Sequence, residues 1–253
     1  MKILHLSDLH RCQRDKNAKN EQDLWIKSLL ENIDVAVVTG DVFESENYRN
    51  QHFNPYEVLS NVFGDKMVLF CLGNHEFYYR TPQWTREYYT DRYDKDKYNV
   101  HCLDVIGHYD VDNVRFLGNV LWYDGSMKTV KNQKMIEFAD GTWCDMTIKS
   151  FRWVKEHDLC RQQIENSLQT KGDKKSVLCV HCVPHEKLNG HLENIMSPYN
   201  AYSGIKGFLD RYKFDWCLCG HTHWRILCEI NGCNCVNVGN HLFPPYQHYF
   251  FEL

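Results

Sequence analysis

Two pairs of side chains with two-residue spacing stand near opposite ends of the chain and could bind cations. Asp8 and His10 follow an apolar run at the start of the chain, and His221 and His223 follow another near its end. In an extended segment, residues two apart point to the same side, so both members of a pair can reach one ion. The spacing therefore predicts cation ligands from both ends of the chain.

Three further side chains between these pairs have the same chemical character. Asp41 follows Gly40 on a predicted tight turn, where a carboxylate can approach two ions at once, while Asn74 offers an amide oxygen and His181 another imidazole. Mixed imidazole, carboxylate and amide ligands suit manganese, iron, zinc, cobalt or nickel better than calcium or a thiolate-bound structural zinc. We take manganese as the first candidate among these ions.

The number of candidate ligands predicts more than one ion. Seven side chains exceed what a single tetrahedral ion can use. Two divalent ions about 3.5 to 4 Å apart would use all of them, and this spacing is found in enzymes that hydrolyse phosphate esters. A water bridging two such cations loses its proton near neutral pH and can attack phosphorus, so no serine or cysteine nucleophile is needed.

Each candidate ligand stands at the end of a predicted strand. Apolar runs that precede the ligands span residues 2–7, 35–39, 68–71, 176–180 and 216–219. Strands of open α/β sheets present ligands at their carboxyl ends, so these side chains should meet in one site. A helical pattern over residues 21–32 separates the first two strands and predicts a right-handed parallel unit.

The rest of the chain has weaker patterns. Further helices are expected over 55–62, 147–170 and 201–212. Antiparallel or edge strands are expected at 100–103 and 114–121, with a hairpin at Asn231-Gly232 and a final edge strand over 249–252. The aromatic and charged segment 77–98 predicts a helix whose rings either pack on the body or form a stacking wall for a nucleobase.

In chain order, the polar motifs resemble the calcineurin-like metallophosphoesterase superfamily, and the segments 114–118, 121–122 and 194–205 resemble its small bacterial and phage members. The motifs that carry the resemblance are Asp8-x-His10, Gly40-Asp41, Gly73-Asn74-His75-Glu76, His181 and Gly220-His221-x-His223. The resemblance implies an α/β fold of four layers, an α/β/β/α double β-sandwich. Because the motifs run from the start of the chain almost to its end, we expect residues 1–253 to form a single metallophosphoesterase domain.

The same resemblance implies a role for each residue. One metal would be held by Asp8, His10, Asp41 and His223, and the other by Asp41, Asn74, His181 and His221. Asp41 would bridge the two ions and is therefore expected to be catalytic. His75 would not bind metal, but would donate a hydrogen bond to a phosphoryl oxygen or a proton to the leaving group.

Several other residues have two interpretations. Glu44 could orient a metal ligand or a metal-bound water, or it could be a surface carboxylate. His185 could line the pocket or lie on a solvent-facing loop, whereas His5 is expected to be a hydrogen-bonded core or interface histidine. The alternating cysteines at 217, 219, 233 and 235 lack the usual zinc-knuckle spacing and are expected to be buried thiols.

Composition and charge indicate which partners and which cellular location to expect. The net charge of −4 gives no support for a globally basic surface that steers nucleic acid. A basic groove confined to one part of the surface remains an alternative. No apolar run is long enough for a signal peptide or a membrane span. The 12 cysteines lie largely within apolar strands, so we expect a reduced, cytoplasmic protein.

The predicted function is hydrolysis of a phosphate ester, with a phosphodiester, nucleotide or nucleic acid as substrate. Phosphomonoesterase and protein phosphatase activities are the alternatives. The second is disfavoured because residues 40–46 lack the Gly-Asp-x-Val-Asp-Arg-Gly motif of protein serine/threonine phosphatases. An alternative of another class is a non-catalytic scaffold on the same fold.

Overall fold

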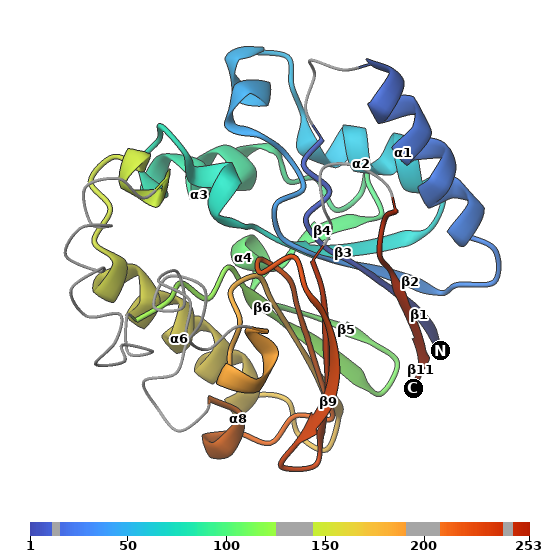
Figure 1. The fold of residues 1–253 in the computed structure, drawn as a ribbon, viewed down its shortest axis with the longest axis vertical. Coiled ribbons are helices and arrows are strands. Elements are labelled where there is room, and N and C mark those ends of the chain that lie inside the picture. The colour runs from blue at the N-terminus through green and yellow to red at the C-terminus, as the bar shows by residue number, and fades with distance from the viewer. Residues whose placement is uncertain (12–15, 125–143, 191–207, 240–244) are drawn as a thin grey trace.

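Two β-sheets form the centre of the protein (Figure 1). The computed structural model describes residues 1–11, 16–124, 144–190, 208–239 and 245–253. The first sheet has the strand order β11-β1-β2-β3-β4 and the second β5-β6-β7-β8-β10-β9. The strands are β1 (Lys2–Leu6), β2 (Val35–Thr39), β3 (Met67–Cys71), β4 (Val100–Cys102), β5 (His108–Val111), β6 (Val114–Asn119), β7 (Lys175–Val180), β8 (Trp216–Cys219), β9 (Arg225–Ile230), β10 (Cys233–Val238) and β11 (Tyr249–Glu252).

Helices lie on the outer faces of both sheets. Figure 1 shows α1 and α2 over the first sheet and α6 beside the second. The helices are α1 (Lys16–Leu29), α2 (Pro55–Phe63), α3 (Pro82–Arg92), α4 (Leu103–Ile106), α6 (Trp153–Gln169) and α8 (Phe208–Arg211), with short 3-10 helices η1 (Ser45–Arg49), η2 (Asn74–Phe77), η3 (Cys144–Thr147) and η4 (Glu186–Leu188).

Alternating side chains of the strands build two apolar layers, as strand geometry requires. Ile3 and Val35 of the first sheet pack with Phe116 and Val177 of the second, which forms a core between the sheets. The alternate positions face outward and pack in a larger cluster that includes residues of α1, α2 and α6. The expected four-layer α/β/β/α arrangement is therefore confirmed.

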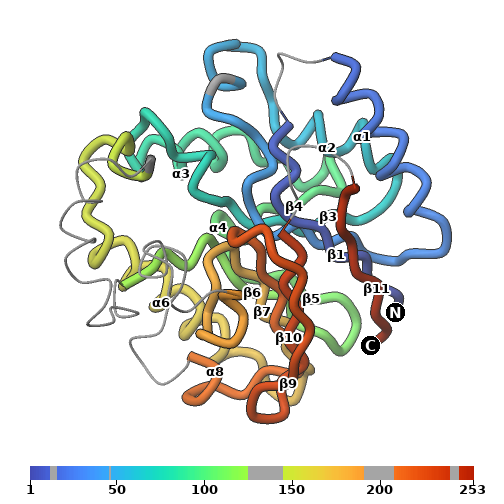
Figure 2. Tube along the Cα trace, viewed as in Figure 1, coloured from blue at the N-terminus to red at the C-terminus, as the bar shows by residue number. Residues whose placement is uncertain are grey.

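Strand direction places the polar strand ends together. Strands β1 to β4 are parallel to one another, as are β6, β7, β8 and β10. Antiparallel strands β11, β5 and β9 lie at sheet edges. β11 pairs with β1, so the two ends of the chain lie side by side (Figure 2). The parallel unit predicted from the first strand, helix and second strand is confirmed.

Some predicted boundaries were wrong. Helix α1 begins at Lys16 rather than at residue 21. The segment 114–121 contains β6, which pairs antiparallel with β5, one of the two predicted alternatives, but lies inside the second sheet with β7 parallel on its other side; β5 itself was missed. The predicted helix over 201–212 is seen only as α8, because residues 201–207 lie outside the described part of the chain.

The aromatic segment packs its rings on the body of the protein. Within α3, Tyr88 and Tyr89 are buried, and the Tyr89 hydroxyl lies 2.9 Å from that of Tyr48. Trp84 stacks on Tyr88 with ring centroids 5.0 Å apart. These contacts favour the packing interpretation over a stacking wall for most of the segment.

The cysteines fit the buried-thiol interpretation. All ten cysteines whose side chains are described are free, and those at 217, 219, 233 and 235 are buried. Within the described residues, no cysteine belongs to a group that could hold a metal ion. In the same part of the chain, no helix has the length and apolar character needed to cross a bilayer.

His5 is a buried core histidine, as predicted, and should make stability depend on pH. Its side chain is fully buried, and Nε2 lies 2.9 Å from Thr39 Oγ1. Burial lowers the pKa of His5 from 6.5 to about 3. Below pH 6.5 the unfolded chain therefore binds a proton that the folded state does not, so the free energy of unfolding decreases as the pH falls from about 6.5 toward 3.

We expect His5→Gln to remove this contribution. One proton corresponds to a slope of about 1.4 kcal/mol per pH unit, and the glutamine amide can still bond Thr39. Urea unfolding at pH 7, 6 and 5 should show a shallower loss of stability in the variant than in the wild type. Equal slopes in the two proteins would contradict the assignment.

Candidate metal centre

Five strand ends bring the predicted site residues together. Asp8 and His10 follow β1, Asp41 follows β2, Asn74 and His75 follow β3, His181 follows β7, and His221 and His223 follow β8. Five of these residues have a left-handed backbone, with φ between 44° and 68°: Asp8, His10, Asp41, His221 and His223. Non-glycine residues rarely adopt this conformation, and such strain is concentrated at functional sites.

One group of side chains converges around the Asn74 amide oxygen. His181 Nε2 lies 2.9 Å from Asn74 Oδ1 and 3.3 Å from Asp41 Oδ2. His221 Nδ1 lies 3.1 Å from both Asn74 Oδ1 and His181 Nε2. Asp41, His181 and His221 together could hold a metal ion.

A second group forms beside the first from Asp8, His10 and His223. His223 Nε2 lies 3.3 Å from Asp8 Oδ1 and 3.4 Å from His10 Nε2. The other oxygen of Asp8 accepts hydrogen bonds from the Ser7 hydroxyl and from the backbone N–H of His221. These contacts fix the carboxylate with Oδ1 toward the two imidazoles, and the three residues could also hold a metal ion.

Asp41 lies between the two groups. Its Oδ2 atom is 3.3 Å from His181 Nε2 in the first group and 4.0 Å from His10 Nε2 in the second. Its Oδ1 atom accepts a hydrogen bond of 2.9 Å from the backbone N–H of His75. A single carboxylate oxygen therefore faces both groups.

The histidine tautomers suit a cation. His181 Nδ1 lies 2.9 Å from the backbone carbonyl of Thr39, and His10 Nδ1 lies 2.9 Å from Glu44 Oε1. Because a carbonyl and a carboxylate only accept hydrogen bonds, each Nδ1 carries a proton, and Nε2 is the ring atom that faces the site and could bind a cation after releasing any proton of its own. The donor set is thus the one that a divalent first-row ion requires.

Residues 1–225 match the family model of calcineurin-like phosphoesterases. The chain belongs to the calcineurin-like phosphoesterase family. The family hydrolyses phosphate esters and generally uses a binuclear divalent metal centre, in agreement with the two donor groups described above. A comparison with curated proteins finds no match to the chain.

Solved structures share the fold of this calcineurin-like phosphoesterase at low sequence identity. The phosphopantetheinyl hydrolase of Mycobacterium tuberculosis is 14% identical with a TM-score of 0.67, and the match covers 94% of this chain and 88% of that one. A dimetal phosphatase from Danio rerio is 13% identical with a TM-score of 0.54, covering 94% and 87%. A purple acid phosphatase from yellow lupin is 15% identical with a TM-score of 0.51, covering 94% and 43%.

Ionisable groups within the site of this phosphoesterase shift one another's pKa. Burial opposes ionisation of Asp8, but the hydrogen bond to His223 and the charges of His181 and His223 together outweigh burial and lower the pKa of Asp8 to about 2. Burial likewise opposes protonation of His181, but Asp41 raises the pKa of that imidazole to about 9. A divalent cation and these protons compete for the same nitrogen lone pairs, so metal binding should release protons.

Glu44 orients two histidines of the site. Besides His10, it contacts His75, whose Nδ1 lies 2.9 Å from Glu44 Oε2. Despite burial, these two histidines lower the pKa of Glu44 to about 2, so it remains an anion. Of the two interpretations given for Glu44, the contacts support the orienting role.

His185, for which a pocket position and a loop position were both considered, accepts a hydrogen bond from the Lys187 N–H at the start of η4.

Three residues that contact the site were missed by sequence reasoning. Asn74 Nδ2 donates to the hydroxyl of Tyr78 at 2.6 Å and to Asp145 Oδ1 at 3.0 Å, and Tyr123 donates to the other oxygen of Asp145. Glu76 was named only as the last residue of the Gly73-Asn74-His75-Glu76 motif. It is fully buried and accepts hydrogen bonds from the backbone N–H groups of Phe43 and Gly73, which ties the β2 and β3 loops together.

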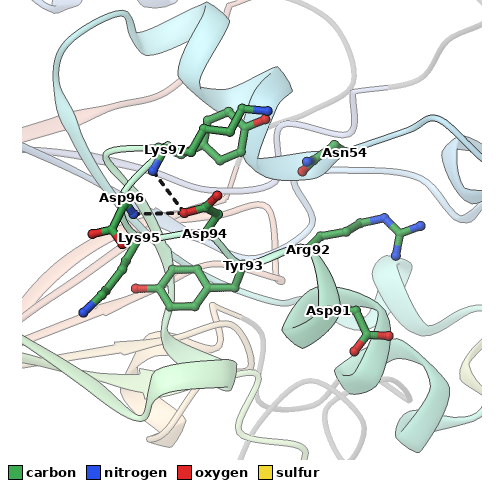
Figure 3. A pocket seen from close by; sticks show the side chains of 9 residues that line it. Asn54, Asp91, Arg92, Tyr93, Asp94, Lys95, Asp96 and Lys97 are labelled. Carbon is green, nitrogen blue, oxygen red and sulfur yellow. Dashed lines mark hydrogen bonds between the residues drawn. The ribbon is translucent and has the colours of Figure 1, made fainter.

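A separate cavity of ≈ 630 Å³ near the end of α3 has a different chemistry (Figure 3). Its three cationic side chains are balanced by three aspartates, and none of the predicted site residues lines it. Asp94 accepts hydrogen bonds from the backbone N–H groups of Asp96 and Lys97 within its wall. The candidate metal centre is therefore the better place for phosphoester chemistry.

Proposed function

We propose that the protein is a two-metal phosphodiesterase that acts on nucleotides or nucleic acid, with manganese as the first candidate ion. The observation that carries the proposal is the position of Asp41, one of whose carboxylate oxygens, Oδ2, faces both donor groups. In this proposal one ion is held by Asp8, His10, Asp41 and His223, and the other by Asp41, Asn74, His181 and His221. Two bound cations would activate a water and neutralise the charge of the phosphoryl group.

His75 supplies the proton in this proposal. Its Nδ1 is bonded to Glu44, which leaves Nε2 directed toward the site, 3.8 Å from Asp41 Oδ2. Burial opposes the charged form of His75, but Asp41 and Glu44 raise its pKa to about 10. The imidazolium can therefore donate a hydrogen bond to a phosphoryl oxygen or a proton to the leaving group.

The aromatic residues after His75 support a nucleotide substrate. The Tyr78 ring lies against the His75 ring with centroids 4.6 Å apart, and Tyr79 is 55% exposed. A half-buried ring that lies beside His75, such as that of Tyr78, can stack on a base without regard to its identity. Residues 1–253 are proposed to form one domain, since β11 pairs with β1 and both sheets supply site residues. The free thiols support a reducing, cytoplasmic location.

An activity and metal assay tests this function. Protein loaded with manganese, zinc, iron, cobalt or nickel would be assayed with an aryl phosphodiester, an aryl phosphomonoester, nucleotides, cyclic nucleotides and single-stranded DNA. We expect two bound ions and faster cleavage of diesters than of monoesters. Two bound ions without turnover of any phosphate ester would favour the scaffold alternative instead, and faster monoester cleavage would favour a phosphomonoesterase.

Glu44→Gln should weaken catalysis without unfolding the protein. The amide cannot hold both His10 and His75 as the carboxylate does, and loss of a partner that orients a metal ligand typically costs about 10- to 100-fold in affinity or activity. We expect kcat/KM for the diester to fall within this range. Glu87→Gln is the control, because Glu87 is exposed on α3 and accepts a hydrogen bond from the Gln83 side chain rather than from a site residue. Equal activity of the two variants would argue against the role of Glu44.

A further inference from the structure

Asp145 is a fully buried carboxylate that contacts the Asn74 side chain at its amide nitrogen. It lies in η3, 71 residues along the chain from Asn74. Its Oδ1 atom accepts a hydrogen bond of 3.0 Å from Asn74 Nδ2, and its Oδ2 atom accepts one of 3.1 Å from the Tyr123 hydroxyl. The mechanism above gives this carboxylate no role.

The carboxylate determines which end of the Asn74 amide faces the histidines. The oxygen and nitrogen ends of an asparagine amide have nearly the same shape, so their surroundings decide between the two orientations. Both oxygens of Asp145 accept hydrogen bonds, from Asn74 Nδ2 and from the Tyr123 hydroxyl, and therefore the nitrogen end of the Asn74 amide faces Asp145. Asn74 Oδ1 is then directed to His181 Nε2 and His221 Nδ1, at 2.9 and 3.1 Å.

The reverse orientation would prevent cation binding by this group. A rotated Asn74 would present N–H donors to the two imidazole nitrogens and would occupy their lone pairs. It would also place the amide oxygen against Asp145, where two acceptors repel each other. Tyr123 is itself fully buried, so its hydroxyl holds Asp145 in place.

The hydrogen bond to Asp145 also strengthens Asn74 as a ligand. A hydrogen bond from an amide N–H to an anion draws electron density toward the amide oxygen, and such bonds are stronger in a buried site than in water. Asn74, a neutral side chain, thereby offers a more negative oxygen. A carboxylate bonded to a metal-ligating histidine has the same effect on the imidazole.

We propose that Asp145 is a positioning residue that orients and polarises Asn74 so that it can bind a cation. The inference rests on the proposed two-metal site and makes a narrower statement about it. Asp145 contacts Asn74 but none of Asp8, His10 and His223 within the described contacts. Its loss should therefore weaken one ion and leave the other bound.

Two substitutions at this position separate orientation from charge. Asp145→Ala removes both, whereas Asp145→Asn keeps an oxygen that accepts from Asn74 Nδ2 and adds an amide that can donate to the Tyr123 oxygen. In titrations with Mn²⁺ followed by electron paramagnetic resonance, we expect Asp145→Ala to lower the affinity of one ion by about 10- to 100-fold. The asparagine variant should recover most of that loss, and the other ion should change less than about threefold.

A readout that needs no metal tests the orientation directly. In metal-free protein, the side-chain NH₂ signals of Asn74 in ¹H–¹⁵N spectra should be protected from exchange in the wild type and in Asp145→Asn. In Asp145→Ala the proton that faces Asp145 should lose this protection, whereas the proton bonded to the Tyr78 hydroxyl should keep it. Glu156→Gln is the matched control, because Glu156 is a buried carboxylate that pairs with Arg86 away from the site. It should change neither the Asn74 signals nor either affinity.

The possible results distinguish this inference from the proposed function. Unchanged Asn74 signals in Asp145→Ala would overturn the positioning role even if two ions bind. An equal loss of affinity for both ions, with Asp145→Asn no better than Asp145→Ala, would show a merely structural role and would also overturn it. Protected Asn74 signals that depend on Asp145, in a wild-type protein that binds fewer than two ions, would support the positioning role and overturn the two-metal function alone.

Discussion

Replacing Asp41 by asparagine should nearly abolish phosphoester hydrolysis and release at least one bound cation. Its Oδ2 atom is the only carboxylate oxygen in the described ion-pair contacts that faces both donor groups, at 3.3 and 4.0 Å from His181 and His10. An amide removes the negative charge and can present an N–H to the imidazoles. Since the loss of an indirect partner costs about 10- to 100-fold, the loss of a shared ligand should exceed about 100-fold in kcat/KM.

Metal analysis and steady-state assays with the aryl diester check this expectation. Asp110→Asn is a suitable control, because Asp110 pairs with Arg115 in the β5–β6 hairpin and not with any site residue. We expect the control to keep two ions and its activity. Activity of Asp41→Asn within tenfold of the wild type would contradict the shared-ligand role of Asp41.

Replacing Gly40 by alanine should destabilise the protein and displace His181. Gly40 has a left-handed backbone with φ of +82°, and a Cβ built on it would lie 2.3 Å from His181 Nδ1 and 2.5 Å from Cγ of the same ring. His181 cannot move aside easily, because it is fully buried and bonded to Thr39. A left-handed alanine costs about 1 to 2 kcal/mol and an overpacked core about 1 to 3 kcal/mol, so we expect a loss of about 2 to 5 kcal/mol.

Gly232→Ala separates the two costs. Gly232 has nearly the same φ, +81°, but a Cβ there would meet nothing within 4 Å. Urea unfolding should therefore show a loss of about 1 to 2 kcal/mol for this variant, with metal content unchanged. If the two alanine variants were equally stable and bound metal equally, the close approach of Gly40 to His181 would be unimportant.

The site could be predicted from the sequence where its residues follow strand ends. His181 comes directly after the buried strand β7, and Asp41 is separated from the buried strand β2 by Gly40 alone. The shared edge of parallel strands was therefore sufficient to place the two residues together. Asp145 gave no such signal, because it lies in the short η3 and its partner is 71 residues away. Tyr78 and Tyr123 were missed for the same reason, since a hydroxyl contact between distant loops has no periodicity.

The fold was predictable to a similar extent. Strong apolar runs predicted the central strands, and the Asn231-Gly232 turn predicted the β9–β10 hairpin, which is confirmed. Strand β5 was missed because its residues are only half-buried at an edge and include His108 and Asp110. It forms through its pairing with β6 across a turn at Asp112, whose φ is +51°, and this depends on tertiary contacts rather than on local pattern.

The origin of the ligands in both sheets has a consequence for the whole molecule. Asp8, Asp41 and Asn74 come from one sheet, and His181, His221 and His223 come from the other. Cations held by ligands from both groups would link the two sheets to each other. Free ion at 100 times its dissociation constant adds about 2.7 kcal/mol to the stability of a folded state that alone binds it. The melting temperature would then depend on the concentration of free ion. Chelators would weaken the contact between the two sheets before either sheet unfolds.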